Sequence, residues 1–421
     1  MNTFLGYQCS ICRSEYSPGE VIYTCPKDHG NLNVVLDYSK ISTAYTPASI
    51  FLSKEYSLWR YLALIPVLDP GGENSPLHAA GYTPVYALAG LAHQLQLDHL
   101  WIKDESRNPT ASFKDRASAV VVAKAREIGA QVVVTASTGN AGAALAGMAA
   151  AIGQKAIIFA PRSAPPAKIA QLLIYGAKVY LVDGTYDDAF DLTVKAASEF
   201  GWYCRNTGYN PFTAEGKKTA AFEIWEWMCH LEPMVRKPLV IFVSVGDGNI
   251  ISGLHKGFLD LLRLGWLDHS PRIFGVQAQG SAAIANAYFA GTENITPVKA
   301  ETLADSISVD LPRDGVRAIR AARETSGGYI VVTDDEILSA IAQLGKAGIF
   351  AEPAGAASYA GMVKAVKNGM IENDEPVLVI NTGSGLKDIH AAMKAVSQPV
   401  IIEPTLAALK KAIHWLGQSG W

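Results

Sequence analysis

The segment from Gln131 to Gly153, QVVVTASTGNAGAALAGMAAAIG, decides the fold. It opens on a run of β-branched residues, Val132–Thr135, which favours a strand, and it ends in alanine-rich sequence, which favours a helix. A turn of serine, threonine, glycine and asparagine joins the two parts. An apolar strand that leads directly into a helix is typical of strands covered on both faces, as in the parallel sheets of α/β proteins.

The same alternation of short apolar runs and helical stretches continues along the chain from about residue 83. The predicted strands cover residues 99–103, 131–135, 156–159, 178–182, 239–244, 272–277, 329–332 and 377–380. The helices predicted after the first four strands cover residues 115–128, 141–152, 167–175 and 186–200. Residues 398–421 are predicted to form a strand followed by an amphipathic helix. We therefore predict an α/β fold built on parallel sheets.

Composition narrows the classes of function. The chain has 421 residues, 49% of them hydrophobic and 18% charged, which is ample for large buried cores. The 36 Lys and Arg residues against 39 Asp and Glu residues give a net charge of −3, so nothing draws the chain generally to nucleic acid or to an anionic membrane. No apolar run has the length of a membrane helix, the N-terminus shows no signal peptide, and five cysteines do not suggest a disulfide framework. We expect a cytoplasmic protein without a nucleic-acid or membrane partner.

Polar turns follow four of the predicted strands. In open α/β sheets a ligand binds beyond the carboxyl ends of the strands, so a site is expected in these turns. The turns are KDESRNPTASFKDR (103–116), TASTGNAG (135–142), SVGDGNIISG (244–253) and NTGSGLKD (381–388).

The first turn offers a lysine and the second an anion site. Lys114 could form an imine with an aldehyde cofactor if burial and the nearby Arg116 keep its amine neutral; otherwise it is a solvated lysine at a helix start. In the second turn, consecutive N–H groups at a helix N-terminus suit a carboxylate, while the plainer interpretation is an ordinary helix cap.

The third and fourth turns suit a phosphate and a ring nitrogen. The glycines of Gly246–Ile250 would let the backbone approach a phosphate at a helix N-terminus, with Asp247 expected to point away from it. The sequence fits neither a dinucleotide fingerprint nor a Walker A loop. A hydroxyl such as that of Thr382 could bond a neutral ring nitrogen, although glycine and serine are also common in simple turns.

Taken together and in this order, the four turns resemble the pyridoxal-phosphate enzymes of fold type II, the tryptophan-synthase-β-like family. Within that family the chain is most similar to the threonine synthase-like group. The phrases that carry the likeness are NPTASFKDR, STGNAGAALA, NPFTAEGKKTAAFEI, VGDGN, FAEPAGAAS and TGSGLKD. The resemblance covers roughly residues 83–394 and the cysteine-bearing head.

The resemblance implies a role for individual residues. Lys114 would hold pyridoxal 5'-phosphate as a Schiff base and then act as the general acid and base. The other cofactor-binding residues that it implies are Phe113 near the ring, Asn140 beside the ring hydroxyl, Thr382 at the pyridine nitrogen, and Gly246, Asp247, Gly248, Asn249 and Ile250 at the phosphate. The implied substrate-binding residues are Ser137, Thr138, Gly139, Ala141, Asn206 and Lys217.

The resemblance also implies the domain organisation and the reaction. Two doubly wound parallel-sheet domains would enclose the active site, a smaller mobile one (116–210) and a larger one that binds the cofactor phosphate (76–115 and 211–395). A zinc-ribbon-like head and arm (1–75) and a tail (396–421) would complete a chain that forms a homodimer. The reaction would convert O-phospho-L-homoserine and water to L-threonine and phosphate. The alternative is an ammonia-lyase acting on threonine or serine, or another β/γ-replacement enzyme of the group.

Two departures from the family pattern leave the substrate open. Ala141 lacks a hydroxyl that many threonine synthases use, and Arg205-Asn206-Thr207 stands where an Asn-Ser pair is usual. Three cations, Arg162, Lys168 and Lys217, are candidates to bind a substrate phosphate.

The N-terminal head has the spacing of a zinc ribbon whose fourth ligand is altered. Cys9 and Cys12 form one pair, and Cys25 is followed by Asp28 where a fourth cysteine is expected; His29 could substitute. The alternatives are zinc held by Cys9, Cys12, Cys25 and His29, or a ribbon that folds without metal. A nucleic-acid-binding ribbon on an inactive scaffold is disfavoured because residues 1–40 contain few cations.

Overall fold

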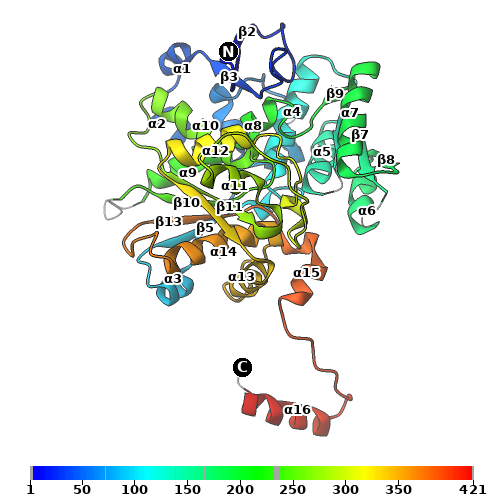
Figure 1. The fold of residues 1–421 in the computed structure, drawn as a ribbon, viewed down its shortest axis with the longest axis vertical. Helices are drawn as coiled ribbons and strands as arrows, with labels where there is room; N and C mark the ends of the chain where they lie inside the picture. Colours follow the sequence, from blue (N-terminus) through cyan, green and yellow to red (C-terminus); the bar gives the residue numbers. More distant parts are fainter. Residues whose placement is uncertain are drawn as a thin grey trace.

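The computed structural model describes residues 3–71, 73–137, 139–162, 164, 166–231 and 237–419. Figure 1 shows two sheets covered by helices, with a small antiparallel head at one end and an isolated helix at the other. Among the described residues, no helix is both long and apolar enough to cross a membrane.

The larger sheet has six strands in the order β12-β11-β10-β13-β5-β4. Their bounds are β4 Val85–Ala87, β5 Leu100–Asp104, β10 Val240–Ser244, β11 Arg272–Ala278, β12 Gly328–Val332 and β13 Val377–Asn381. Neighbouring strands are parallel except β4, which pairs antiparallel with β5 at the edge. The sheet is therefore mixed at that edge, where a purely parallel sheet was predicted.

Helices cover both faces of this sheet because its central strands are apolar on both sides (Figure 1). In β10, Ile241 and Val243 face the cluster that contains α10, whereas Val240 and Phe242 face the one that contains α14. The helices of the first face include α8 Phe212–Lys217, α9 Thr219–Met228, α10 Asn249–Arg263, α11 Ala283–Phe289 and α12 Gly315–Glu324. Those of the second are α3 Ala89–Leu95, α13 Asp334–Lys346 and α14 Pro353–Lys367.

The smaller sheet has four parallel strands in the order β8-β7-β6-β9. Their bounds are β6 Val132–Ala136, β7 Lys155–Pro161, β8 Lys178–Val182 and β9 Tyr203–Cys204. Helices α4 Lys114–Glu127, α5 Asn140–Ala151 and α6 Pro166–Ile174 lie on one face, and α7 Tyr186–Phe200 on the other. Both sheets are thus covered on two faces by helices, which confirms the predicted fold class.

The head and arm precede the larger sheet in the chain. The head is a sheet of order β2-β1-β3, formed by β1 Phe4–Cys9, β2 Glu15–Tyr16 and β3 Leu32–Leu36. The arm contains α1 Tyr38–Ala44, α2 Pro47–Phe51 and η1 Leu58–Leu64, and η2 Pro76–Ala79 follows it before β4. Short 3₁₀ turns elsewhere are η3 Glu105–Arg107, η4 Gln279–Ser281, η5 Asp305–Ile307 and η6 Gly385–Lys387.

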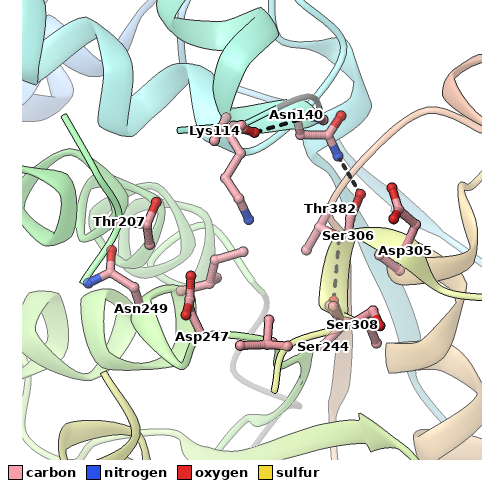
Figure 2. A pocket seen from close by; sticks show the side chains of 18 of the residues that line it. Lys114, Asn140, Thr207, Ser244, Asp247, Asn249, Asp305, Ser306, Ser308 and Thr382 are labelled. Atoms are coloured by element: carbon pink, nitrogen blue, oxygen red, sulfur yellow. Dashed lines mark hydrogen bonds between the residues drawn. The ribbon is translucent and has the colours of Figure 1, made fainter. Parts of the chain in front are cut away.

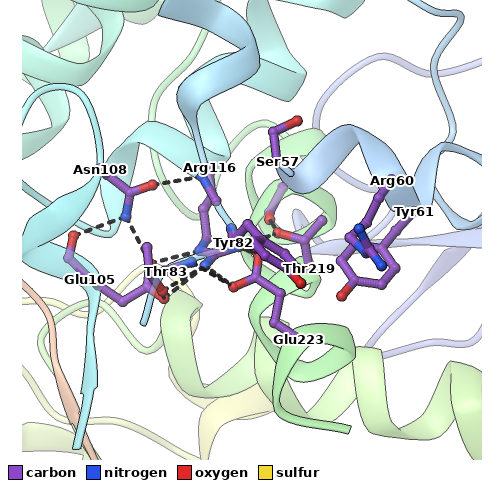
Figure 3. A network of polar contacts seen from close by, with 12 residues as sticks. Ser57, Arg60, Tyr61, Tyr82, Thr83, Glu105, Asn108, Arg116, Thr219 and Glu223 are labelled. Atoms are coloured by element: carbon purple, nitrogen blue, oxygen red, sulfur yellow. Dashed lines mark hydrogen bonds and ion pairs between the residues drawn. The ribbon is translucent and has the colours of Figure 1, made fainter. Parts of the chain in front are cut away.

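A buried ionic network anchors the start of α4 (Figure 3). The Arg116 guanidinium donates to Glu105 Oε2 at 2.7 Å and to Glu223 Oε2 at 2.7 Å, and Lys103 Nζ donates to Glu223 Oε2 at 2.7 Å. The Thr83 hydroxyl donates to Glu105 Oε1 at 2.7 Å. Because these charges are fully enclosed, the network holds its members in one geometry, and the first turn of α4 with them.

The C-terminal residues extend away from the two sheets (Figure 1). Helix α15 Ile389–Lys394 is followed by an extended stretch and then by α16 Leu406–Ser419. The strand predicted near residue 398 is absent, since residues 397–403 have neither helix nor strand. The Ile401 side chain, which a sheet would bury, is 96% exposed.

Candidate active site

One cavity of about 310 Å³ lies where the turns after β6, β10 and β13 meet α4 (Figure 2). It collects most of the residues that the sequence predicted for the site. Those that line it are Lys114, Ser137, Gly139, Asn140, Ala141, Lys217, Gly246, Asp247, Gly248, Asn249, Ile250 and Thr382. Phe113 and Asn206 are buried and not part of its lining, and Thr138 lies outside the described residues.

Lys114 is the first residue of α4, and its side chain extends into the cavity (Figure 2). The preceding Phe113 is fully buried and donates its backbone N–H to the Thr382 carbonyl at 2.9 Å, which ties α4 to the end of β13. Burial lowers the pKa of Lys114 to about 8; Glu352 opposes this shift and the charge on Arg205 adds to it. The neutral form of the amine, which imine chemistry requires, is therefore far more populated near neutral pH than it is in an ordinary lysine.

Asn140 begins α5 and reaches across the cavity to Glu352. Its Nδ2 donates to Glu352 Oε1 at 2.7 Å and to Ser306 Oγ at 3.4 Å. Burial raises the pKa of Glu352 to about 7, and the charges on Lys387 and Lys114 counteract it. Sequence reasoning assigned Glu352 no role, although the segment FAEPAGAAS that contains it contributed to the resemblance.

The turn Gly246–Ile250 joins β10 to α10 and has the geometry of a phosphate cradle. Gly248 has a left-handed φ of +92°, and a Cβ there would lie 2.7 Å from the Asp314 carbonyl oxygen. Asn249 begins α10, so the N–H groups of the first helical turn are directed toward the cavity side of the turn. A larger residue at position 248 could not keep this backbone.

The orientation of the Asp247 side chain differs from the one predicted. Its carboxylate lies at the cavity, where it was expected to point away (Figure 2). Its Oδ1 accepts the Arg313 backbone N–H at 3.2 Å, and burial raises its pKa. The backbone hydrogen bond explains the orientation, because it holds the side chain on the cavity side of the turn.

Asn206 and Lys217 were both predicted to border the substrate, but the structure gives them different roles. Lys217 is fully buried at the cavity and donates to Asn249 Oδ1 at 2.6 Å, with a pKa lowered by burial and by Lys114. Asn206 instead accepts the Ala136 N–H at 2.8 Å and thereby fixes the end of β6. The residue that reaches the cavity from this loop is Thr207, which sequence reasoning noted only as a departure.

The turn before α5 and the ends of β10 and β13 complete the lining of the cavity. Ser137 Oγ accepts the Gly139 N–H at 3.2 Å within the turn before α5. The Thr382 and Ser244 hydroxyl oxygens lie 3.4 Å apart at the ends of β13 and β10. These hydroxyls belong to strands whose carboxyl ends meet at the cavity, as the position of ligand sites in α/β sheets predicts.

Two of the proposed phosphate-binding cations lie outside this cavity. Arg162 is 74% exposed and sits 3.6 Å from Asp183. Lys168 pairs with Asp305 and lines an adjoining cavity of about 350 Å³, which shares Asn140 and Glu352 with the first. Only Lys217 of the three candidates lies in the lining of the main cavity.

A second cluster lies in the head. The ligand atoms of Cys9, Cys12, Cys25 and Asp28 all lie within 4.8 Å of one another. Cys9 Sγ is 3.3 Å from Asp28 Oδ1, and the Cys12 and Cys25 sulfurs are 3.7 Å apart. The fourth member is thus Asp28, where His29 was the predicted ligand; His29 has a left-handed φ of +57°, and its side chain is not part of the group.

The cavity fits pyridoxal phosphate by the chemistry of its donors: a lysine with a lowered pKa, backbone N–H groups at a helix N-terminus, and a buried hydroxyl at a strand end. A family model described as pyridoxal-phosphate dependent enzyme matches residues 77–383, and the chain belongs to this family.

The chain is similar to threonine synthases over nearly its whole length. It is 38% identical to the threonine synthase of Methanocaldococcus jannaschii over 413 residues, covering 97% of this chain and 99% of that protein. The threonine synthase of Methanosarcina acetivorans is 38% identical over 410 residues, covering 96% and 98%. The predicted resemblance to threonine synthase-like pyridoxal-phosphate enzymes is therefore confirmed. The similarity to these relatives supports the assignment of this chain as a pyridoxal-phosphate-dependent lyase with threonine synthase activity.

Solved structures show the same fold at lower identity. The processed form of threonine deaminase isoform 2 from Solanum lycopersicum superposes with a TM-score of 0.64 at 22% identity, covering 90% of this chain and 95% of that one. Maize serine racemase gives a TM-score of 0.62 at 22% identity, covering 80% and 93%. These likenesses concern the fold alone.

Proposed function

We propose that this chain converts O-phospho-L-homoserine and water to L-threonine and phosphate, as a pyridoxal-phosphate-dependent threonine synthase. One observation carries the proposal: Lys114, with a pKa near 8, lines the same cavity as the glycine turn Gly246–Ile250. The choice of substrate rests on the similarity of the chain, over nearly its full length, to threonine synthases. In the reaction phosphate leaves Cγ and the elements of water add, with the hydroxyl at Cβ.

The cofactor-binding roles follow from position in the cavity. Bound pyridoxal phosphate would supply an electron sink for loss of the substrate α-proton. The backbone of Gly246, Asp247, Gly248, Asn249 and Ile250 would hold its phosphate, Thr382 its ring nitrogen and Asn140 its ring hydroxyl, with Phe113 packed behind Lys114. Asn140 reaches this position because Glu352 holds its amide.

Lys114 is the proton-carrying residue in this proposal. Its Nζ has no hydrogen-bond partner among the described residues, so it is available to a reacting group in the cavity. A pKa of about 8 lets the amine accept a proton from carbon and return it at neutral pH. The neighbouring Arg205 charge would favour the neutral form again after each transfer.

The substrate would occupy the side of the cavity formed by the turn before α5. The backbone of Ser137, Thr138, Gly139 and Ala141 would bind its carboxylate at the N-terminus of the helix. Lys217 would border the substrate in the same cavity, and Asn206 would act indirectly by fixing the end of β6. Domain closure around this cavity would exclude bulk water.

The test is an assay of the protein loaded with pyridoxal phosphate. Absorbance near the visible edge, lost in Lys114→Ala, would report the lysine-bound cofactor. Phosphate release from O-phosphohomoserine then distinguishes the proposal from its alternative, an ammonia-lyase, which would form a 2-oxo acid from threonine or serine. A holoprotein that forms the 2-oxo acid and releases no phosphate would contradict the proposal.

We also propose that the head binds one zinc ion through Cys9, Cys12, Cys25 and Asp28. Three sulfurs and one carboxylate oxygen are a ligand set that tetrahedral zinc accepts, and their atoms are already gathered within 4.8 Å. Metal analysis after zinc loading and dialysis should find one zinc per chain and none in Cys25→Ser. Cys229→Ser, outside the cluster, is the matched control. Metal-free wild-type protein after the same treatment would refute the site.

The assembly and domain division remain proposals. The strands of the larger sheet lie in residues 85–104 and 240–381 and those of the smaller in 132–204, which supports domains at 76–115 with 211–395 and at 116–210, a head at 1–75 and a tail at 396–421. We infer a homodimer in the cytoplasm; light scattering of the holoprotein would test the dimer.

A further inference from the structure

Asn31, which directly precedes β3 in the head, bonds both halves of the molecule with a single side chain. Its Nδ2 donates to the Gly208 carbonyl oxygen at 2.5 Å and to the Arg313 carbonyl oxygen at 3.0 Å. Gly208 lies in the loop after β9, a strand of the smaller sheet, and Arg313 precedes α12, a helix packed on the larger sheet. Because an amide nitrogen carries two hydrogens, Asn31 uses one of them on each half.

Gly208 and Arg313 also contact each other directly. A Cβ at Gly208 would lie only 2.7 Å from the Arg313 Cβ, and the φ of Gly208 is +71°. The Arg313 side chain extends further across to α7 on the smaller sheet, where its Nη2 donates to Asp187 Oδ1 at 3.0 Å. The two halves of the molecule therefore meet at the contact between Gly208 and Arg313, and Asn31 bonds both of its sides.

Each side of this contact leads directly to the cavity. Thr207, which precedes Gly208, lines the cavity (Figure 2). On the other side, the Arg313 N–H donates to Asp247 Oδ1 at 3.2 Å, and Asp247 belongs to the turn Gly246–Ile250. A shift of Arg313 relative to Gly208 would therefore move two walls of the cavity relative to each other.

The backbone around Asn31 is held by the cysteine and aspartate cluster of the head. The Asn31 carbonyl oxygen accepts the N–H of Ser10, which directly follows the first cysteine of the cluster, at 2.9 Å. The preceding Gly30 donates its N–H to Asp28 Oδ1 at 2.9 Å, and its carbonyl oxygen accepts the Cys25 N–H at 3.0 Å. A metal ion that fixes these ligands would therefore also fix the position of Asn31.

We propose that Asn31 is a positioning residue of the active site, through which the head holds two walls of the cavity together and couples metal binding in the head to ligand binding in the cavity. The inference rests on the proposed function for its substrate and on the proposed zinc site for the coupling. Without Asn31, a smaller fraction of the protein has the walls in the binding arrangement, and apparent dissociation constants rise in proportion. The coupling is reciprocal, so zinc and pyridoxal phosphate should strengthen each other's binding by the same factor.

The primary test is Asn31→Ala, which removes both donors. We expect the KM for O-phosphohomoserine and the dissociation constant of pyridoxal phosphate to rise about 5- to 100-fold, the range for two hydrogen bonds between neutral groups. The kcat should stay within about threefold of wild type, because Lys114 is unaltered and bound substrate itself favours the closed arrangement. Asn31→Asp keeps the shape but places acceptors opposite two carbonyl oxygens, and it should be at least as impaired.

Tyr38→Phe is the control for a loss of stability alone. The Tyr38 hydroxyl donates to Asp260 Oδ1 at 2.7 Å and joins the arm to α10 on the larger sheet. Its removal should lower the Tm and leave the KM and the cofactor dissociation constant unchanged.

Gly208→Ala tests the same contact without altering the head. The added Cβ would force Gly208 and Arg313 apart, so it should raise the same two constants. The double variant with Asn31→Ala should be little worse than either single one, because both disrupt one interaction. Gly201→Ala is the matched control, since it has a left-handed φ of +66° but no atom within 4 Å of the added Cβ. It should leave both constants unchanged.

The coupling has a readout that needs no turnover. Fluorescence titration of the apoprotein with pyridoxal phosphate should show binding about fivefold tighter, or more, in zinc-loaded than in metal-free wild type. Asn31→Ala should still bind zinc but lose this difference. Equal cofactor affinities in the two forms of wild type, or a difference that persists in Asn31→Ala, would overturn the coupling.

The outcomes separate this inference from the proposals on which it rests. If wild type releases phosphate but Asn31→Ala keeps the wild-type KM and cofactor affinity, or loses only kcat, the inference is wrong and the function stands. If wild type releases no phosphate, the function fails, and the cofactor titrations decide the inference. If the head binds no zinc, the coupling fails with the metal site, and the KM and cofactor affinity of Asn31→Ala decide whether Asn31 positions the cavity.

Discussion

The Asn140 side-chain amide donates a 2.7 Å hydrogen bond to Glu352 Oε1 across the cavity. Asn140 begins α5 on the smaller sheet, and Glu352 immediately precedes α14 on the larger one. This bond therefore joins the two halves of the site at the residue proposed to face the cofactor ring. It also places a buried carboxyl group, whose pKa is about 7, beside the reacting centre.

Glu352→Gln should change how stability depends on pH. Burial raises the pKa of Glu352 from 4.5 to about 7, so the folded state favours the protonated form and loses stability as pH rises between these values. The difference corresponds to about 3 kcal/mol at most. Glutamine cannot ionise, so the Tm of the variant apoprotein relative to wild type should be higher at pH 8 than at pH 5. An offset that stays constant across this range would show that Glu352 does not titrate there.

The uptake of pyridoxal phosphate by the apoprotein should follow the titration of Lys114. Because burial lowers the pKa of this amine to about 8, its neutral, reactive form should reach half of its maximum near pH 8 and level off about one pH unit higher. Stopped-flow absorbance after adding the cofactor measures the rate, with Lys114→Ala as the blank. A rate that continues to increase toward pH 10.5, the ordinary lysine value, would contradict the lowered pKa.

Gly248→Ala should impair the phosphate cradle specifically. A Cβ at this position would lie 2.7 Å from a backbone carbonyl oxygen, and the left-handed φ adds about 1–2 kcal/mol. We expect a lower Tm and at least tenfold weaker cofactor binding, measured by fluorescence titration. Gly265→Ala is the matched control, because it has a left-handed φ of +68° but no atom within 4 Å of the added Cβ. Equal cofactor affinities in the two variants would argue against the cradle.

Glu223→Gln should destabilise the fold through the network of Figure 3. Among the described residues it leaves Arg116 and Lys103 with Glu105 as their one buried carboxylate partner, and breaking such a pair costs about 3–5 kcal/mol. Denaturant unfolding at neutral pH measures the loss. Asp374→Asn, which breaks an exposed pair with Lys237, should have little effect. Similar losses of unfolding free energy in Glu223→Gln and Asp374→Asn would mean that burial of an ion pair does not determine the cost of breaking it.

The sequence predicted the elements around the cavity because each strand is a short apolar run that ends in a polar turn. The strand predicted at 131–135 is Val132–Ala136 in the structure, and the helix predicted at 141–152 is Asn140–Ala151. The turns could be placed at one site because parallel strands bring their carboxyl ends to the same edge. The edge strand β4 could not be assigned, since three residues carry too little pattern.

The parts of the site that sequence reasoning missed depend on long-range contacts. Glu352 lies 212 residues from Asn140 in the chain, and only the placement of α5 beside the start of α14 in the structure shows that they meet. Arg205 is an ordinary charged residue in the sequence, and its unpartnered Nη2 is visible only once its neighbours are placed. Likewise, Asp28 replaces His29 in the head because the backbone of Gly30 and Cys12 bonds the Asp28 carboxylate and turns it toward the sulfurs.

The most direct test of the central claim is to incubate the holoprotein with O-phospho-L-homoserine and measure phosphate and threonine together, with Lys114→Ala as the control. We expect equimolar phosphate and L-threonine from wild type and neither product from the variant. Wild-type protein that binds pyridoxal phosphate yet releases no phosphate, or a Lys114→Ala variant that retains full activity, would contradict it.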